Sequence, residues 1–384
     1  MKQNWEYKKL TDVCSIQYGY PFESGNFTNE ANGMPLIRIR DVKDGQTETY
    51  YEGPYPAEYI VHKGEYLIGM DGEFNIAPWK SDDALLNQRV CKITAKEGVF
   101  VGFLYRFLIK ELKRIEDETP FVTVKHLSAK RLNQVTLPVP PLSVQSRIVA
   151  ELDLLTGIID KQNAQLKELD NLAQAIFYDM FGDPIENPKG WEVQLLKQHT
   201  TKIGSGATPK GGNESYKSEG IPLIRSLNVY NGTFKYKDLA HIDENQAAAL
   251  DNVILQGGDV LLNITGASVA RCCIVPCDLV SGRVNQHVAI LRPKDSLKSV
   301  FLCAQLISSG YQQKLLHDSK ANGATREALT KSQLEGLPII VPPLALQQSF
   351  AEKIQSIEKQ KETIRASIAD TQKLLDYTMD KYFG

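Results

Sequence analysis

The sequence predicts an α+β protein with two globular domains held apart by two long antiparallel coiled-coil helices, with approximate two-fold internal symmetry. Three observations predict this fold. The chain of 384 residues contains an internal repeat, each repeat ends in a long heptad pattern, and short apolar segments bounded by Gly, Asn and Asp precede that pattern.

Composition sets the class of protein. Lys and Arg number 44, Asp and Glu number 46, and 42% of residues are hydrophobic. These values suit a globular chain with room for two domains and exclude disorder, collagen and a small disulfide scaffold. Neither an N-terminal apolar signal segment nor an apolar run of ~20 residues is present. We therefore expect a cytoplasmic protein without a membrane segment.

The offset between matching residues of the two repeats increases along the first part of the repeat and is constant along the last part. Trp5-Glu6 recurs as Trp191-Glu192 at an offset of 186 residues, and Asn87-Gln88 recurs as Asn285-Gln286 at 198. From Leu127 to Gly182 the offset stays at 202. Related frames with loops of different size suggest two readers of different targets, whereas the part of constant length suggests a structural or docking role.

Each repeat begins with candidate strands and one candidate helix. Apolar segments between turn residues predict the strands, and apolar spacing of three and four residues predicts the helices. In the first repeat these are strands 35–39, 65–69 and 89–93 and helix 99–115; in the second they are strands 222–226, 258–264 and 286–291 and helix 299–316.

Each repeat then ends in a predicted long helix, 143–182 and 345–384. Apolar residues alternate at spacings of four and three, which is the heptad pattern. Residues 148–180 alone would span about 48 Å, so a paired helix would act as a ruler between the domains. The apolar seats are Ile148, Leu152, Leu155, Ile159, Leu166, Leu169 and Ile176 in the first helix, and Phe350, Ile354, Ile357, Ile364, Ile368 and Leu375 in the second.

Three residues depart from the apolar pattern of these predicted helices. Gln162 and Lys361 occupy heptad seats, where a polar residue either fixes the pairing register or marks a seat that faces water. Gly157 should cost about 1 kcal/mol relative to Ala, so either a bend or a close contact is expected there.

Two related domains in opposite orientation suit a bipartite DNA sequence, whose half-sites are spaced by helical turns of ~34–36 Å. Residues 1–142 have a net charge of −1 and residues 183–344 of +2, so neither has a bulk basic excess. DNA affinity would come from local side chains, although each one is alternatively a solvated or ion-paired surface residue. The candidates near polar turns are Arg38, Arg40, Lys43, Asn75, Asn87, Gln88, Arg89, Thr208, Lys210, Arg225, Asn263, Arg271, Arg283, Asn285, Gln286, His287 and Arg326.

No catalytic constellation is recognisable in the sequence. A P-loop and a methyltransferase motif are absent, and Glu111-Leu112-Lys113, the nearest match to a nuclease motif, falls in a predicted helix. The six histidines lack ligand spacing. Cys272 and Cys273 are adjacent on a predicted strand and point to opposite faces, so together with Cys277 they are expected to be buried thiols rather than a metal site.

Several motifs, in this order and duplicated, resemble one known family. They are Gly69-Met70-Asp71-Gly72 with Asn87-Gln88-Arg89, then Gly206-Ala207-Thr208-Pro209 with Asn285-Gln286-His287, and two Pro-Pro-Leu-x-x-Gln entries into long helices, at residues 140–145 and 342–347. Over essentially its whole length the chain resembles the specificity (S) subunit of type I restriction-modification systems. The second repeat departs from the first with Asn263-Ile264-Thr265-Gly266, which implies a different half-site.

The resemblance implies target recognition domains at 1–142 and 183–344 and conserved spacer helices at 143–182 and 345–384. It implies a non-catalytic subunit that binds double-stranded DNA, two modification (methyltransferase) subunits and motor-nuclease restriction subunits. S-adenosylmethionine, ATP and Mg would be bound by those partners, and this chain would hold no cofactor or metal. Two alternatives remain open at this point: a protein-interaction scaffold, which the near-neutral charge favours, and an enzyme with its own nuclease centre.

Overall fold

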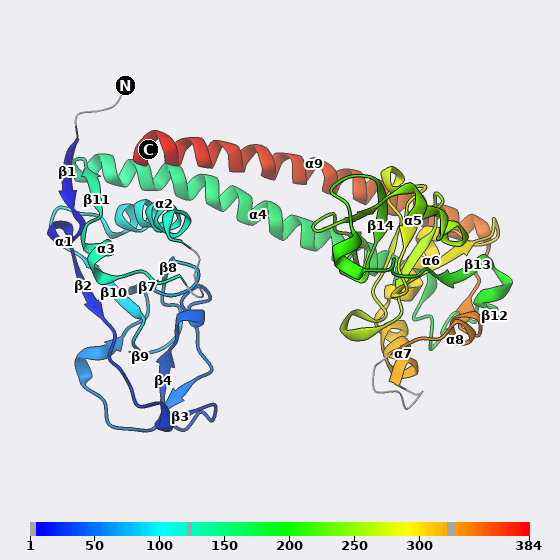
Figure 1. The fold of residues 1–384 in the computed structure, drawn as a ribbon, viewed down its shortest axis with the longest axis horizontal. Helices are drawn as coiled ribbons and strands as arrows, with labels where there is room; N and C mark the ends of the chain where they lie inside the picture. The colour runs from blue at the N-terminus through cyan, green and yellow to red at the C-terminus, as the bar shows by residue number, and fades with distance from the viewer. Residues whose placement is uncertain (1–4, 121–124, 321–327) are drawn as a thin grey trace. The chain divides into compact units, whose positions relative to one another are not determined.

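The computed structural model describes residues 5–120, 125–320 and 328–384 (Figure 1). Contacts divide the chain into unit 1, residues 1–163 and 366–384, and unit 2, residues 164–365. Both boundaries fall inside long helices, α4 (Leu142–Phe181) and α9 (Leu344–Phe383). Each unit combines sheets and helices, which confirms the predicted α+β class. None of the helices in the described ranges is both long and apolar enough to cross a bilayer.

Unit 1 is built on a four-stranded antiparallel sheet, with a second, five-stranded sheet beside it. Helix α2 (Val101–Glu118) and the start of α4 bury the main core against the first sheet (Figure 1). The first sheet has the spatial order β2 (Cys14–Tyr18), β10 (Val90–Ala95), β7 (Tyr66–Gly69), β8 (Asn75–Pro78). The second has the order β3 (Phe27–Thr28), β5 (Tyr50–Tyr51), β4 (Met34–Ile37), β9 (Ala84–Leu86), β6 (Ile60–Val61). The remaining elements are β1 (Glu6–Lys9), which pairs with β11 (Thr136–Val139), α1 (Leu10–Val13) and α3 (Ala129–Asn133).

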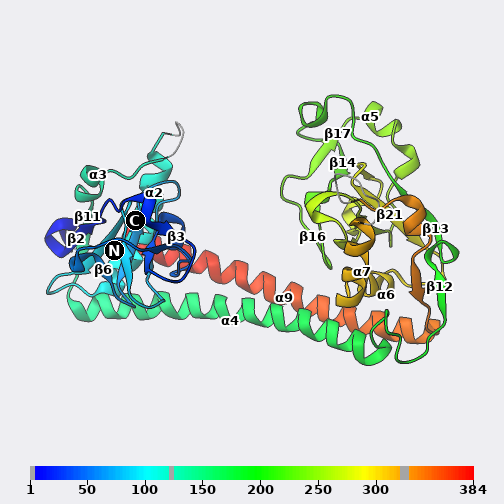
Figure 2. The ribbon, with the colours of Figure 1, turned by 90° about the horizontal axis from the view of Figure 1, so that it is seen from below.

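Unit 2 repeats the order of the four-stranded sheet and, in its second sheet, the order of the three central strands β5, β4 and β9. Its four-stranded sheet has the order β13 (Thr200–Ser205), β21 (Val288–Pro293), β18 (Val260–Asn263), β19 (Cys272–Ile274), and its second sheet the order β17 (Ala240–Ile242), β14 (Ile221–Ile224), β20 (Arg283–Val284) (Figure 2). The further elements are the pair β12 (Val193–Leu195) and β22 (Pro338–Ile340), the hairpin β15 (Val229–Tyr230) and β16 (Thr233–Phe234), and helices α5 (Glu244–Ala248), α6 (Ser299–Ile307), α7 (Ser309–Lys320) and α8 (Lys331–Glu335). The sequence repeat is thus a repeat of sheet order.

All six predicted strands are present, with ends that differ by at most two residues from the prediction. Helix 299–316 was predicted as one element, and this prediction is wrong. The chain breaks at Ser308, whose ψ of 148° is extended, and resumes as α7. The hydroxyl of Tyr178 accepts a hydrogen bond from the backbone N–H of Ser309 at 3.0 Å, which supports the start of α7.

The two Pro-Pro-Leu-x-x-Gln motifs place a buried glutamine at the base of each long helix. Oε1 of Gln145 accepts from the backbone N–H of Phe100, and its Nε2 donates to the carbonyl of Pro140. Gln347 bonds in the same way to the N–H of Lys298 and the carbonyl of Pro342. Each glutamine therefore fastens the long helix to the residue directly before a core helix, α2 in unit 1 and α6 in unit 2.

Within each unit, segments of α4 and α9 lie antiparallel. In unit 1, Glu151 bonds to Tyr382 and Gln162 bonds to Ser367. In unit 2, Phe177 packs on Phe350 with ring centroids 5.8 Å apart. Every heptad seat named above is buried or half-buried. The helices pair through the face that the heptad pattern marks.

The polar seats make hydrogen bonds between the helices. Nζ of Lys361 lies 2.6 Å from Asp170 and 2.7 Å from Glu358, and its side chain is 5% exposed. Nε2 of Gln162 donates to Ser367 at 2.7 Å. The contacts of Lys361 agree with a seat that fixes register rather than one that faces water.

Two smaller expectations are settled by packing. A Cβ placed on Gly157 would meet no atom within 4 Å, so no close contact explains this glycine. Cys272 belongs to the core beside α6, whereas Cys273 belongs to the core on the other face of the sheet. This separation follows from the alternation of side chains along a strand. Cys277 is exposed on the turn that follows β19, so the expectation of a buried thiol is wrong for this residue.

Candidate nucleic-acid interface

Three loops of unit 1 leave the four-stranded sheet at the same end. Strand β7 ends at Gly69, which pairs with Val90, the first residue of β10. The backbone N–H of Gly19, which follows β2, donates to the carbonyl of Val90. Gly19 has to be glycine, because a Cβ there would lie 2.0 Å from the carbonyl oxygen of Asn87. The segments that follow β2 and β7 and the one that precedes β10 therefore meet at one edge.

The backbone frame of this edge is the same in both units. In unit 1 the N–H of Met70 donates to the carbonyl of Arg89 at 2.9 Å, and the N–H of Leu127 donates to Met70 at 2.7 Å. In unit 2 Ile264 donates to His287 at 3.0 Å and Leu329 to Ile264 at 2.8 Å. Arg89 and His287 are therefore equivalent positions.

The frame of unit 1 carries a cluster of Asp71, Arg89 and His126. Oδ1 of Asp71 lies 2.5 Å from Nδ1 of His126, and Nη1 of Arg89 lies 3.1 Å from the same nitrogen. Nε of Arg89 lies 3.7 Å from Oδ2 of Asp71. Asp71 and His126 orient the guanidinium of Arg89 from one side. Its side chain remains 51% exposed, so a ligand in solvent can reach it.

The backbone of Arg89 has a φ of 70°, in the left-handed region. A residue with a Cβ is disfavoured there by about 1 kcal/mol or more, and such conformations concentrate at functional sites. The backbone conformation thus marks this arginine independently of its charge.

The frame of unit 2 carries an uncharged hydrogen-bond chain instead. The hydroxyl of Thr208 donates to Oε1 of Gln286, and Nε2 of Gln286 lies 3.3 Å from Nε2 of His287. Nδ1 of His287 lies 2.5 Å from the hydroxyl of Thr265. Gln286 is exposed and His287 is half-buried. At the position of Arg89 this edge therefore presents the imidazole of His287, next to an amide, Gln286, that corresponds to Gln88 in unit 1.

The other candidates of unit 1 lie on nearby turns. Arg38 and Arg40 are exposed, and Nη2 of Arg40 lies 3.4 Å from the hydroxyl of Thr49. Lys43 is exposed and pairs with Glu73 at 3.2 Å, and Nδ2 of half-buried Asn75 donates to the carbonyl of Glu73.

In unit 2 two cations flank one aromatic ring. Nζ of Lys235 lies 3.8 Å and the guanidinium carbon of Arg271 lies 4.5 Å from the ring centroid of Tyr230. Arg225 stacks on Tyr216 and donates to the carbonyl of Asp238. Lys210 is exposed. Arg326 falls outside the described residues.

Four of the predicted contacts lie in the interior, and their burial argues against base contact. Asn87 and Asn285 cap their own turns by accepting from the N–H of Gln88 and of His287. The amide of Asn263 is fully buried and donates to the carbonyl of Ser226.

Arg283, the fourth, occupies the strand position of Leu85 in unit 1: Leu36 pairs with Leu85 in a parallel ladder, and Leu223 pairs with Arg283. Its guanidinium bonds to Asp251 and to three carbonyls. These contacts indicate a structural role.

Sequence reasoning missed Asp71, His126 and Thr265 as members of the two clusters. Asp71 and Thr265 precede equivalent glycines, Gly72 and Gly266, which both have a φ of 74°. The glycine recurs in both repeats, whereas the polar residue before it differs. This difference was the signal in the sequence that could have marked Asp71 and Thr265. No comparable signal marked His126, since its partner Asp71 is 55 residues away in the chain.

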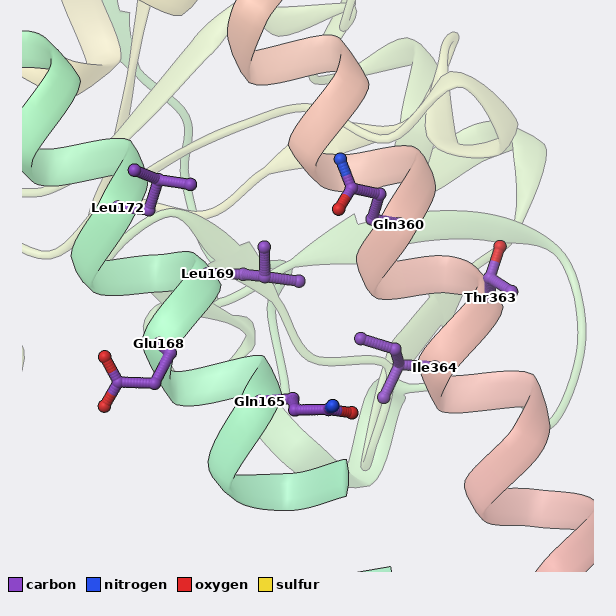
Figure 3. Close-up of a pocket in the computed structure, with 7 residues that line it drawn as sticks. All are labelled: Gln165, Glu168, Leu169, Leu172, Gln360, Thr363 and Ile364. Carbon is purple, nitrogen blue, oxygen red and sulfur yellow. The ribbon is translucent and has the colours of Figure 1, made fainter. Parts of the chain in front are cut away.

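A groove lies between the long helices in unit 2 (Figure 3). Leu169 of α4 and Ile364 of α9 point toward one another across it, and Gln165 and Gln360 lie on either side. The remaining lining residues are Glu168, Leu172 and Thr363. Among the described residues, no group of three His, Cys, Asp or Glu side chains is arranged to hold a metal ion.

Comparison with known proteins assigns this architecture to one family. The model of the type I restriction modification DNA specificity domain matches residues 2–171 and 188–370. The specificity subunit of the type I restriction enzyme EcoBI from Escherichia coli is 31% identical over 393 aligned positions, covering 93% of this chain and 81% of that protein. The MjaVIII specificity subunit of Methanocaldococcus jannaschii is 21% identical and covers 93% and 86%.

Solved structures agree in fold. The S subunit of a type I system from M. genitalium superposes with a TM-score of 0.55 at 13% identity, covering 99% of this chain and 96% of that one. A chain from a structural study of type I complex assembly and conformational transition superposes at 0.56 with 19% identity, covering 100% and 98%. The duplicated sheets, the paired long helices and the match over both repeats show that the chain belongs to the family of type I restriction-modification specificity (S) subunits.

Proposed function

We propose that each unit reads one half of a split, asymmetric sequence in double-stranded DNA. One observation carries this proposal: the two units share a backbone frame at the same sheet edge but place different chemistry on it, Arg89 with Asp71 and His126 in unit 1 and His287 with Thr265 in unit 2. Equal frames with unequal side chains suit two related readers of unequal sequences.

Phosphate contacts would come from neighbouring cations. Lys235 and Arg271 beside Tyr230 form a compact positive surface in unit 2, and Arg38, Arg40 and Lys43 lie on the turn after β4 in unit 1. Such contacts hold a protein on the duplex without reading its sequence. Local surfaces of this kind would compensate for the near-neutral charge of each repeat.

We further propose that the paired helices bind two modification (methyltransferase) subunits, and that the assembly includes restriction subunits. In this proposal the chain is non-catalytic, and the partners hold S-adenosylmethionine, ATP and Mg. Apolar side chains off the heptad seam support a docking role. In unit 1 Leu154, Leu374 and Tyr377 are 65%, 51% and 67% exposed, although they lie on helices whose seam is already paired. In this proposal these side chains form part of the apolar surface that a partner covers.

The test is single-molecule sequencing for methyladenine in cells that carry the chain and its methyltransferase, compared with cells that lack only this chain. We expect a split motif that disappears on deletion, and the motif directly reports both half-sites and the spacer between them. Methylation that is unchanged by the deletion would contradict the proposal and would favour the scaffold alternative, in which the two units bind proteins.

A further inference from the structure

We propose that the last two residues of the equivalent turns, Gln88-Arg89 and Gln286-His287, determine base preference, with Arg89 reading a guanine in one half-site and Gln286, positioned by His287, reading an adenine in the other. This inference rests on the proposed function, because it assumes that each unit contacts its own half-site. Within these two pairs the glutamine is common to both units, and the residue that differs is Arg89 in unit 1 and His287 in unit 2.

The turns are equivalent in backbone and in their first residue. The N–H of Val90 donates to the carbonyl of Asn87 at 3.2 Å, and the N–H of Val288 donates to Asn285 at 3.4 Å. Both asparagines are buried and use their side chains to hold the turn. Of the two residues that follow, the first is an exposed glutamine in both turns, Gln88 and Gln286, and the second differs: Arg89 is exposed and His287 is half-buried.

Arg89 has the geometry of a guanine reader. Guanine presents two acceptors in the major groove, O6 and N7, which match two N–H groups of one guanidinium. Asp71 and His126 contact Nε and Nη1, and within the described residues Nη2 has no hydrogen-bond partner. The carboxylate of Asp71, which is 22% exposed, is paired by these two groups and so repels phosphates less than a free carboxylate would.

Gln286 has the geometry of an adenine reader. Its amide uses one acceptor site for the hydroxyl of Thr208 and one nitrogen contact for His287. An amide has two N–H donors and two acceptor sites, so one of each remains. Adenine presents the matching pair, an N7 acceptor and an N6 donor. Thr265 holds the far side of His287 and fixes the ring.

The experiment uses the full chain assembled with its modification subunits and a duplex library randomised in both half-sites, sequenced after selection by binding. Arg89→Lys keeps the charge but loses the two-pronged geometry, and we expect it to lose preference for one G·C pair in a single half-site. The expected loss is about five- to 150-fold, which corresponds to the ~1–3 kcal/mol of one good bidentate contact. Gln286→Ala should relax one A·T pair in the other half-site, and His287→Arg should move that preference toward G·C.

Arg114→Lys is the matched control, since Arg114 is 54% exposed and also bonds a carboxylate through two nitrogens, but lies on α2. An intact second half-site in each variant shows that the protein is folded. Unchanged preference in Arg89→Lys and Gln286→Ala, with a split motif still selected by the unaltered chain, would overturn this inference and leave the proposed function standing. Absence of any motif with the unaltered chain would overturn both.

Discussion

Nη2 of Arg283 donates a hydrogen bond to Oδ1 of Asp251 at 2.7 Å from a strand position that in unit 1 is held by the apolar side chain of Leu85. The arginine side chain is 8% exposed and also bonds the carbonyls of Ala247, Ser281 and Gly282. A buried cation here ties together three segments of unit 2, in the position that unit 1 fills with a leucine.

We therefore expect Arg283→Ala to lower the free energy of unfolding by about 2–4 kcal/mol, because several carbonyls lose their donor and a cavity opens. Chemical denaturation followed by circular dichroism measures the change. Arg365→Ala is the control, since Arg365 is 47% exposed and should change stability by less than about 0.5 kcal/mol. A stable Arg283→Ala protein with altered base preference would instead support a base contact.

Asp71→Asn should weaken selection in one half-site only. The substitution removes the charge that holds Nε of Arg89 at 3.7 Å and Nδ1 of His126 at 2.5 Å. For a partly exposed pair worth ~1 kcal/mol, we expect preference for the base pair read by Arg89 to fall about fivefold. Library selection with the assembled complex measures it, with Asp117→Asn on α2 as the control. Equal weakening at both half-sites would show that Asp71 acts on the fold as a whole.

Lys361→Met tests the buried cation in the helix pair. The substitution removes the buried partner alone, and the carboxylates of Asp170 and Glu358 are 63% and 44% exposed, so they stay hydrated without it. An apolar side chain in the buried seat avoids the desolvation cost of the ammonium group but removes a device that fixes register. We expect equal or higher stability at pH 7, together with less uniform helix pairing, measured by denaturation and by spin-label distances across the helices. A large loss of stability would show that the ion pairs of Lys361 stabilise the fold by more than the cost of burying its charge.

The same residue predicts a pH dependence. Burial alone would lower the pKa of Lys361, but the hydrogen bonds to Asp170 and Glu358 outweigh it and raise the pKa above the ordinary value of 10.5. A raised folded pKa means that the stabilisation is complete below pH 10.5 and is lost as the pH rises through the folded pKa. The unaltered chain should therefore lose stability relative to Lys361→Met only in strongly alkaline solution, measured by denaturation at a series of pH values.

Gly157→Ala should stabilise helix α4 by about 1 kcal/mol, because the new methyl group meets open space and alanine has the better helix propensity. Thermal unfolding measures the gain. Gly182→Ala is the opposite control: Gly182 has a φ of 78°, and a Cβ there would lie 2.7 Å from Cγ of Pro188. Destabilisation by Gly157→Ala would mean that the glycine serves a bend in the helix.

Deleting one heptad from each long helix should shorten the spacer of the recognised DNA without changing either half-site. Seven residues of helix span about 10.5 Å, so the change is at most about three base pairs. Methyladenine sequencing with the shortened chain measures the spacer. An unchanged spacer would contradict the ruler role proposed for the paired helices.

The sequence by itself determined the duplicated plan. The recurring motifs located the two related frames, the seats from Ile148 onward located the pairing face of the helices, and the six strands followed from their apolar segments. These features depend on local periodicity and on hydrophobicity, which a linear pattern records directly.

Only the tertiary structure decided which polar side chains are presented and which are buried. Arg283 and Arg89 look alike in sequence, yet one lies inside unit 2 and the other lies at a loop edge. His126 joins Asp71 across 55 residues, and at the break after α6 the N–H of Ser309 bonds to the hydroxyl of Tyr178, 131 residues away. Burial and long-range hydrogen bonds are set by contacts between distant segments, and no local pattern encodes them.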